Sequence, residues 1–517
     1  MTEDTGFTSV RPRALLVGLA LAVSSGWLAT LLPFPEPEQA ARGARAMAAT
    51  VFTTTCWLTG AMPLAPASLL PLALFPLLGV QSTGAAAAGY SDPILWMFFG
   101  GFVLAMAIER CGLHRRLALR VIALLGLDPR RLVLGFFAAA TLVSMWINNT
   151  AVTLMLLPIG AALVQRVQGE ALLPEREARS FGVCVLLAIA YGSSIGGVAT
   201  PIGTAPNLLF YRNYQPYVDR GAPPFSFLDW MAAFVPFALG FMVLAWLVLA
   251  RLLHRLGDAE PAVAQRLRAE LRALPPMDSA ERRVAWLFAG AVLLWITRAD
   301  LRLGPGLHVA GWVSWIGLRE QDVLDGSIAV LVAILAFVIP SGRAPRERLM
   351  DWSTARQMPF EILFLLGGGV AIANAFEATG LSAAVGQAAA PTLASVPPFV
   401  AVALTCVGLT LLTEVASNTA ITALMLPLLA ATASTAGMDP RLLMLPATIA
   451  ASCGFALPIG TPPNTVVFAT GRLRMSDMVR AGILLDVLSA VILSLVFWFW
   501  ALPVLGIDPQ QRPGWVR

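Results

Sequence analysis

The sequence predicts an all-α polytopic membrane protein with eleven transmembrane helices plus two re-entrant hairpins, arranged as an inverted repeat. Its 517 residues are 57% hydrophobic and 13% charged, whereas a soluble chain carries about 25% charged residues. Apolar runs near the roughly 20 residues that a bilayer requires recur along the whole chain. Two polar motifs also recur half a chain apart, and the net charge of +5 gives no indication of nucleic-acid binding.

Eleven apolar segments are predicted to cross the membrane. The first follows two arginines but lacks a small-residue cleavage pattern, so we interpret it as a transmembrane helix and not as a signal peptide. The crossings are predicted at residues 14–34, 46–61, 63–81, 94–113, 181–211, 228–253, 284–299, 326–341, 359–380, 441–470 and 481–505. Two further apolar segments, 131–166 and 397–433, are interrupted by a polar triplet and are predicted to be re-entrant hairpins.

The arginines agree with this topology, because positive residues collect in cytoplasmic loops. With the N-terminus in the cytoplasm, most arginines fall in the predicted inside segments near 115–131, 251–283, 343–356 and 472–480. The predicted outside loops hold fewer. If either hairpin were two full crossings, the same parity would result. We therefore expect a multi-pass protein of the cell (inner) membrane with a cytoplasmic N-terminus.

Three collinear matches indicate a duplication. The segment from Ile94 matches that from Ile362, Asn148-Asn149-Thr150 matches Ser417-Asn418-Thr419, and Pro201-Ile-Gly-Thr matches Pro458-Ile-Gly-Thr, at offsets of 268, 269 and 257 residues. An odd number of predicted crossings separates the two leading helices, so the repeats are inverted. Inverted repeats with broken helices are typical of transporters, whose binding site lies near the membrane midplane where the breaks meet.

The motifs have the chemistry to hold an anion together with small cations. The helices that follow the two triplets are predicted to begin with free N–H groups at the positive end of the helix dipole, which attract an anion. Proline and glycine in the Pro-Ile-Gly-Thr segments break the helix and expose carbonyl groups. These carbonyls are predicted to form one oxygen cage for sodium in each repeat, together with side-chain oxygens of Ser144, Asn149, Thr413 and Asn418. The alternative is that such residues merely pack or kink membrane helices.

At these residues the chain resembles the divalent anion/sodium symporter family, which carries C4-dicarboxylates, citrate or sulfate. The resemblance covers nearly the whole chain and includes the early segment 57–80. It implies a homodimer in which each protomer has a scaffold domain at the dimer interface. It also implies a transport domain that holds the hairpins and moves as an elevator.

The resemblance also implies the binding residues. One sodium site would use Ser144, Asn148, Asn149 and the Gly203 carbonyl, and the other Thr413, the Ala416 carbonyl, Asn418 and the Gly460 carbonyl. The substrate would meet Asn148, Asn149, Thr150, Ser417, Asn418, Thr419 and Thr461, with Thr204 and Pro462 adjacent. Asn148 stands where the family usually has serine, so a bulkier amide replaces a hydroxyl that would touch both ion and substrate.

The predicted organisation has five parts. Residues 1–93 are N-terminal scaffold helices, 94–213 the first repeat, 214–358 scaffold helices with a cytoplasmic linker at 257–283, 359–470 the second repeat, and 471–517 the last helix and C-terminus. Each repeat combines a hairpin with a broken helix, 131–166 with 181–211 and 397–433 with 441–470. Within the linker, residues 257–280 are predicted to form an interfacial or solvent-exposed helix.

The leading functional hypothesis is sodium-coupled symport of a small divalent anion, with two or more sodium ions transported rather than held as structural cofactors. The nearest alternatives are a sodium-independent anion exchanger and a proton-coupled symporter of the same fold, for which Asn148 and Glu414 are the relevant residues. An ion channel is an alternative of another class. The sequence shows neither an activated nucleophile nor a metal cluster, so we expect no enzyme and no catalytic residues. The expected partners are the anion, membrane lipid and a second copy of the chain.

Overall fold

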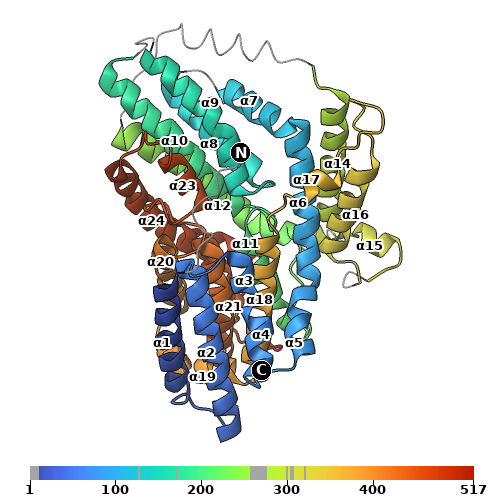
Figure 1. Ribbon diagram of the computed structural model, residues 1–517, viewed down its shortest axis with the longest axis vertical. Helices are drawn as coiled ribbons and strands as arrows, with labels where there is room; N and C mark the ends of the chain where they lie inside the picture. Colours follow the sequence, from blue (N-terminus) through green and yellow to red (C-terminus); the bar gives the residue numbers. More distant parts are fainter. Residues whose placement is uncertain are drawn as a thin grey trace.

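In the computed structural model the chain is helical almost throughout (Figure 1). The structure describes residues 11–125, 128–169, 173–254, 256, 276–298, 301–302, 308–319 and 322–516. Within these ranges the only sheet is an antiparallel pair of two-residue strands, β1 (Leu301–Arg302) and β2 (His308–Val309). The predicted all-α fold is confirmed apart from this pair. Most of the helix predicted at 257–280 lies outside the described residues.

Proline and glycine mark several bounds of the N-terminal helices. The elements are α1 (Pro12–Ala29), α2 (Pro37–Thr59), α3 (Leu64–Ser68), α4 (Leu70–Leu77), α5 (Thr83–Ala88), the short 3₁₀ helix η1 (Gly89–Ser91), α6 (Pro93–Cys111) and α7 (Leu113–Leu125). Both α1 and α2 start with proline. Proline suits this position because the first N–H groups of a helix have no intrahelical acceptor, so its lack of an N–H costs no hydrogen bond. Gly60 ends α2 in the left-handed conformation at φ 57°. In the proline-rich segment predicted as one crossing at 63–81, Leu69 separates two short helices, α3 and α4.

In the first repeat, helices lie on both sides of the polar triplet and on both sides of the Pro-Ile-Gly-Thr segment. They are α8 (Pro129–Ser144), α9 (Asn149–Gly169), α10 (Glu175–Gly197) and α11 (Ala205–Val218). Asp128 caps α8 by accepting a hydrogen bond from the Arg131 N–H at 3.0 Å, and Pro129 follows at the first helical position. Residues 198–204 break the helix between α10 and α11.

The second repeat has the same order of helices as α6 to α11. Its leading helix is α18 (Phe360–Ala378), followed by α19 (Leu381–Ala394), α20 (Pro398–Val415), α21 (Asn418–Thr435), α22 (Arg441–Ala450) and α23 (Pro462–Phe468). Proline starts α20 as it starts α8. The second triplet lies at the start of α21, with Ser417 just before the helix and Asn418 and Thr419 as its first two residues. Residues 451–461 break the helix between α22 and α23. The helices α18 to α23 therefore follow one another in the same order as α6 to α11.

The remaining helices connect or flank the repeats. They are α12 (Phe227–Leu247), which continues as the π-helix η2 (Val248–Leu253), then α14 (Ser279–Ile296), α15 (Trp312–Trp315), α16 (Asp325–Val338), α17 (Trp352–Ala355) and α24 (Met475–Val496), which continues through the π-helix η3 (Phe497–Ala501) to α25 (Leu502–Val504). Figure 1 shows α14, α15 and α16 together on one side, with α8, α9 and α10 toward one end of the long axis.

Nine helices in the described part of the chain are long and apolar enough to cross a membrane. Three of them, α9, α20 and α21, belong to the segments predicted as hairpins. The chain is thus a multi-pass membrane protein. The number of eleven crossings, the re-entrant course of the hairpins and the domain division stay predictions.

Ion pairs between distant segments agree with the predicted sidedness. Among the described residues, pairs on the predicted inner side are Arg110–Asp351, Arg116–Glu281, Arg179–Asp477 and Arg343–Asp278. Those on the predicted outer side are Arg212–Asp92, Arg220–Glu377 and Arg298–Asp325. Each pair joins segments that the topology places on the same side of the membrane.

Replacing Arg116 with methionine is expected to lower the stability of the folded protein. Its guanidinium donates to both oxygens of Glu281 at 2.9 and 2.8 Å, and both side chains are less than a tenth exposed. The substitution would leave a buried carboxylate without this cation, which costs about 3 kcal/mol or more. Thermal unfolding in detergent measures the change. Arg115→Met, at an exposed neighbour, is the control, and equal melting temperatures for the two variants would contradict the prediction.

Candidate functional site

The two repeats interlock at their breaks. Helix α11, which follows the first break, packs against α21 and α22 of the second repeat, while α23, which follows the second break, packs against α9 and α10 of the first. Each break therefore lies between the hairpin of its own repeat and helices of the other. This arrangement brings the four duplicated motifs into one region of the molecule.

In the first repeat, four oxygen atoms converge around Asn149. Its Oδ1 lies 2.7 Å from the Ser144 Oγ, and the carbonyl oxygens of Ser193 and Gly203 lie 3.2 Å from the same end of the amide. With the amide turned over, its nitrogen would donate hydrogen bonds to these three oxygens. In the other orientation the cluster is an oxygen cage, which is the environment that a small hard cation prefers.

The structure thus brings together Ser144, Asn149 and Gly203, three of the four residues expected at the first sodium site. Sequence reasoning missed the Ser193 carbonyl. This oxygen is supplied by the backbone of α10 just before the break, so its residue type carries no signal of its role. Gly197, at the end of α10, allows the close approach, since a Cβ there would lie 2.5 Å from the Asn149 Oδ1.

In the second repeat, Thr413 and Asn418 are brought together in the same way. The Thr413 Oγ1 lies within hydrogen-bond distance of the Asn418 Oδ1, just as Ser144 lies beside Asn149, and it donates to the Ala451 carbonyl at 2.7 Å. Ala416 adopts an extended conformation between α20 and α21. Gly460 packs against Glu414, whose Oε2 would lie 3.2 Å from a Cβ at this position.

The predicted ion-binding and substrate-binding residues differ in exposure. Ser144, Gly203, Thr413, Ala416 and Gly460 are buried, as is Thr461. The half-buried or exposed residues are Asn148, Asn149, Thr150, Thr204, Ser417, Asn418, Thr419 and Pro462. Thr204 and Thr461 occupy equivalent positions before α11 and α23, and the Thr461 hydroxyl accepts the Asn464 N–H at 3.3 Å. An anion could reach the tips of the triplets, whereas the hydroxyls beneath them are enclosed.

The prediction that both triplets offer free N–H groups is wrong for Thr150. The Asn148 Oδ1 accepts the Thr150 N–H at 2.9 Å, so the asparagine caps α9. Ser417, at the equivalent position, makes no capping hydrogen bond through its side chain. The amide that distinguishes the first triplet therefore occupies a donor that would otherwise face an anion.

Asn148→Ser is expected to keep the cation cage and to alter anion binding. Serine is shorter than asparagine, so the substitution opens space at the triplet and makes the two triplets identical. Ser144 and Asn149 are unchanged. We expect the KM for anion uptake to change several-fold, because one charge-facing hydrogen bond contributes about 1 kcal/mol. The half-saturating sodium concentration should stay within twofold. A changed sodium dependence with an unchanged anion KM would contradict this assignment.

Two buried carboxylates lie against the second break. The Glu414 oxygens accept the N–H groups of Ala456 and Leu457 at 2.9 and 2.7 Å, and Asp486 accepts that of Phe455 at 2.9 Å. Sequence reasoning named Glu414 as the residue for a proton-coupled variant and missed Asp486. An aspartate in the apolar middle of α24 is a detectable signal, because intramembrane carboxylates are rarely without a role.

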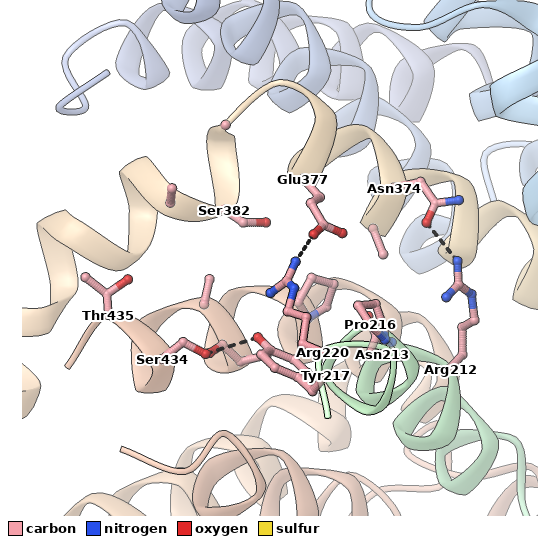
Figure 2. A pocket seen from close by; sticks show the side chains of 16 residues that line it. Arg212, Asn213, Pro216, Tyr217, Arg220, Asn374, Glu377, Ser382, Ser434 and Thr435 are labelled. Carbon is pink, nitrogen blue, oxygen red and sulfur yellow. Dashed lines mark hydrogen bonds and ion pairs between the residues drawn. The ribbon is translucent and has the colours of Figure 1, made fainter. Parts of the chain in front are cut away.

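A cavity of about 280 Å³ lies apart from the motifs, between α11, α18, α19 and α21. Figure 2 shows Arg220 reaching Glu377 across it and Arg212 donating to Asn374, at 2.7 Å. Its polar lining also includes Tyr217, Ser382, Ser434 and Thr435. The predicted site residues do not line this cavity. Glu377, near the end of α18, is therefore paired with an arginine.

Comparison with known proteins identifies close relatives over nearly the whole length. Residues 13–506 match the family model for the sodium:sulfate symporter transmembrane region. The sodium-dependent dicarboxylate transporter SdcS of Staphylococcus saprophyticus is 35% identical over 503 residues, covering 96% of this chain and 93% of that protein. SdcS of Staphylococcus aureus is 34% identical over 501 residues, with the same coverage.

A solved structure shares the fold. The crystal structure of the YdaH transporter of Alcanivorax borkumensis matches with a TM-score of 0.54 and 16% sequence identity, and the match covers 95% of this chain and 98% of that one. At this identity the likeness concerns the fold alone.

Proposed function

The chain belongs to the sodium:sulfate symporter family, and from this premise we propose that it is a secondary active transporter that couples sodium entry to uptake of a small divalent anion. The family and the relatives are transporters and not enzymes. The observation that carries the proposal is the convergence of the Ser144, Asn149, Ser193 and Gly203 oxygens, repeated in part by Thr413 and Asn418. The anion is a C4-dicarboxylate, citrate or sulfate, and the names of the relatives favour a dicarboxylate.

The geometry suggests how the ions and the anion assist one another. Each cage lies directly beneath a triplet, so a sodium ion bound there places positive charge next to the anion. The helix N-terminus at Asn418 adds N–H groups on the same side. Two sodium ions, one in each repeat, would balance the charge of a divalent anion. Binding of either partner then raises the affinity for the other.

We also propose that the chain works as a homodimer in the cell (inner) membrane, with the N-terminus in the cytoplasm and lipid around its apolar helices. The transport domain, which holds the hairpins and broken helices, moves as an elevator against the scaffold and carries the anion with its ions across the membrane.

Uptake into proteoliposomes tests the coupling. Purified protein would be supplied with labelled succinate, citrate or sulfate under an inward sodium gradient, or with choline replacing sodium at equal ionic strength. We expect accumulation of at least one of these anions above its equilibrium level only with the sodium gradient. Equal uptake of every transported anion with sodium and with choline would contradict sodium coupling.

A proton-coupled symporter of the same fold is the second candidate, because Glu414 places a carboxylate directly against the second break. Under this alternative, an inward proton gradient in sodium-free choline buffer would drive accumulation, and Glu414→Gln would abolish it. Under the sodium-coupled proposal, the proton gradient alone drives none. Exchange of internal for external anion without any cation gradient would instead favour the exchanger, and ion currents far above carrier turnover would favour a channel.

A further inference from the structure

Each break is bridged by the side chain of a buried asparagine. Asn207 and Asn464 are the third residues of α11 and α23, six residues after the proline of each Pro-Ile-Gly-Thr segment. They are equivalent in the two repeats. Both side chains are fully buried, with 0% of their surface exposed.

The two amides make the same pair of contacts. The Asn207 Nδ2 donates to the carbonyls of Gly197 at 2.9 Å and Thr200 at 2.7 Å. The Asn464 Nδ2 donates to the equivalent carbonyls, of Gly454 at 3.4 Å and Leu457 at 3.1 Å. Within the described part of the chain, neither amide oxygen accepts a hydrogen bond. Each asparagine thus acts through its NH₂ group alone.

In each break, the glycine whose carbonyl accepts from the asparagine, Gly197 or Gly454, packs directly against the predicted ion cage. A Cβ on Gly203 would lie 2.4 Å from the Gly197 carbonyl oxygen, and one on Gly197 would lie 2.5 Å from the Asn149 Oδ1. In the second repeat, a Cβ on Gly454 would lie 2.9 Å from the Thr413 Cγ2. The path of the chain at Gly197 and Gly454 therefore determines where the cage oxygens stand.

Other side chains secure the breaks differently in the two repeats. Trp230 donates to the Val198 carbonyl at 2.9 Å in the first, whereas Asp486 accepts the Phe455 N–H in the second. Since the surrounding supports differ and the asparagine contacts do not, the asparagine meets a requirement that the two breaks share. An unwound segment inside a membrane helix needs its carbonyls either paired or directed at a ligand. The asparagine pairs two of them and leaves the Gly203 and Gly460 carbonyls out of its hydrogen bonds.

We propose that Asn207 and Asn464 are positioning residues for the two sodium sites, each holding the backbone of one break so that its cage oxygens converge. The inference rests on the proposed sodium coupling. Neither asparagine contacts the cation or the anion. Each sets the affinity of one cage for sodium by keeping its geometry formed before the ion arrives.

Leucine at either position tests the proposal, since it approximates the shape of asparagine without its donors. In proteoliposomes, Asn207→Leu and Asn464→Leu should each raise the half-saturating sodium concentration for succinate uptake about tenfold, from the loss of two hydrogen bonds. The succinate KM, measured at saturating sodium, should stay within about twofold. Asn213→Leu is the matched control, because the buried Asn213 in the same helix donates only to the Leu209 carbonyl of its own helix at 2.8 Å, and it should leave sodium dependence unchanged.

Melting temperature and the fraction of monodisperse protein are measured alongside uptake. If a leucine variant fails to fold, Asn207→Ser and Asn464→Ser keep one donor and should shift the half-saturating sodium concentration about threefold. Variants that lose stability or turnover with the sodium dependence of the wild type would overturn the positioning role. If the wild-type protein transports equally well without sodium, the proposed function itself fails. If the wild type depends on sodium but the variants keep its sodium dependence, only the positioning role fails.

Discussion

Asn149→Ala and Asn418→Ala are each expected to raise the half-saturating sodium concentration for anion uptake about 10- to 100-fold. Each substitution removes the amide that lies against the hydroxyl of Ser144 or Thr413. Alanine leaves the cage one oxygen short and removes one of the contacts that hold the hydroxyl in place. The measurement is initial uptake into proteoliposomes across a series of sodium concentrations at constant ionic strength.

A control variant and a double variant are measured beside the two single variants. Asn213→Ala carries the same substitution on a buried asparagine outside the cages and should behave as the wild type. The double variant Asn149→Ala with Asn418→Ala should lose sodium-driven accumulation altogether, because both cages are incomplete. If one single variant shifts sodium dependence and the other does not, the sites are unequal, and the claim of one functional cage per repeat is wrong.

Gly197→Ala is expected to reduce sodium-driven uptake as strongly as the loss of Asn149. A Cβ at this position would lie 2.5 Å from the Asn149 Oδ1 and 2.8 Å from its Nδ2, closer than real side chains approach one another. The helix end that carries Gly197 is buried against α8 and α9, so the amide is the group that must move. Sodium affinity should therefore fall by at least about tenfold.

The control is Gly408→Ala in α20, where an added Cβ meets no atom within 4 Å. That variant should keep wild-type uptake and gain up to about 1 kcal/mol of stability, because alanine restricts the unfolded chain. Full sodium affinity in Gly197→Ala would mean that the Asn149 amide does not form the cage. Melting curves separate a local effect from misfolding.

The repeat and most helices could be predicted because the signals are local. Apolar runs, the prolines at 129 and 398 and the glycine at 60 mark helix bounds directly in the sequence. The segment 63–81 was predicted as one crossing because its composition is apolar, although its prolines divide it into α3 and α4. Hydropathy reports that a segment is apolar but carries no information on internal breaks.

The candidate site was predictable only where side chains provide the chemistry. Ser144 lies beside Asn149 and Thr413 beside Asn418, and these four side chains were named from the sequence because they carry oxygen atoms. The Ser193 carbonyl could not be inferred, because every residue has a carbonyl and only tertiary structure selects one. The capping bond of Asn148 was missed for a different reason. The amide was expected to bind the ion and the substrate. Its oxygen instead accepts one of the first N–H groups of α9, as asparagine side chains at helix starts commonly do.

The number of sodium ions bound per protomer tests the central claim most directly. Equilibrium binding of radioactive sodium to purified wild-type protein, Asn149→Ala, Asn418→Ala and the double variant would be measured in the presence of saturating succinate. We predict that the wild type binds at least two ions, that each single variant loses one at the same free sodium concentration, and that the double variant loses both. The same number of bound ions in all four proteins would contradict the assignment of one sodium cage to each repeat.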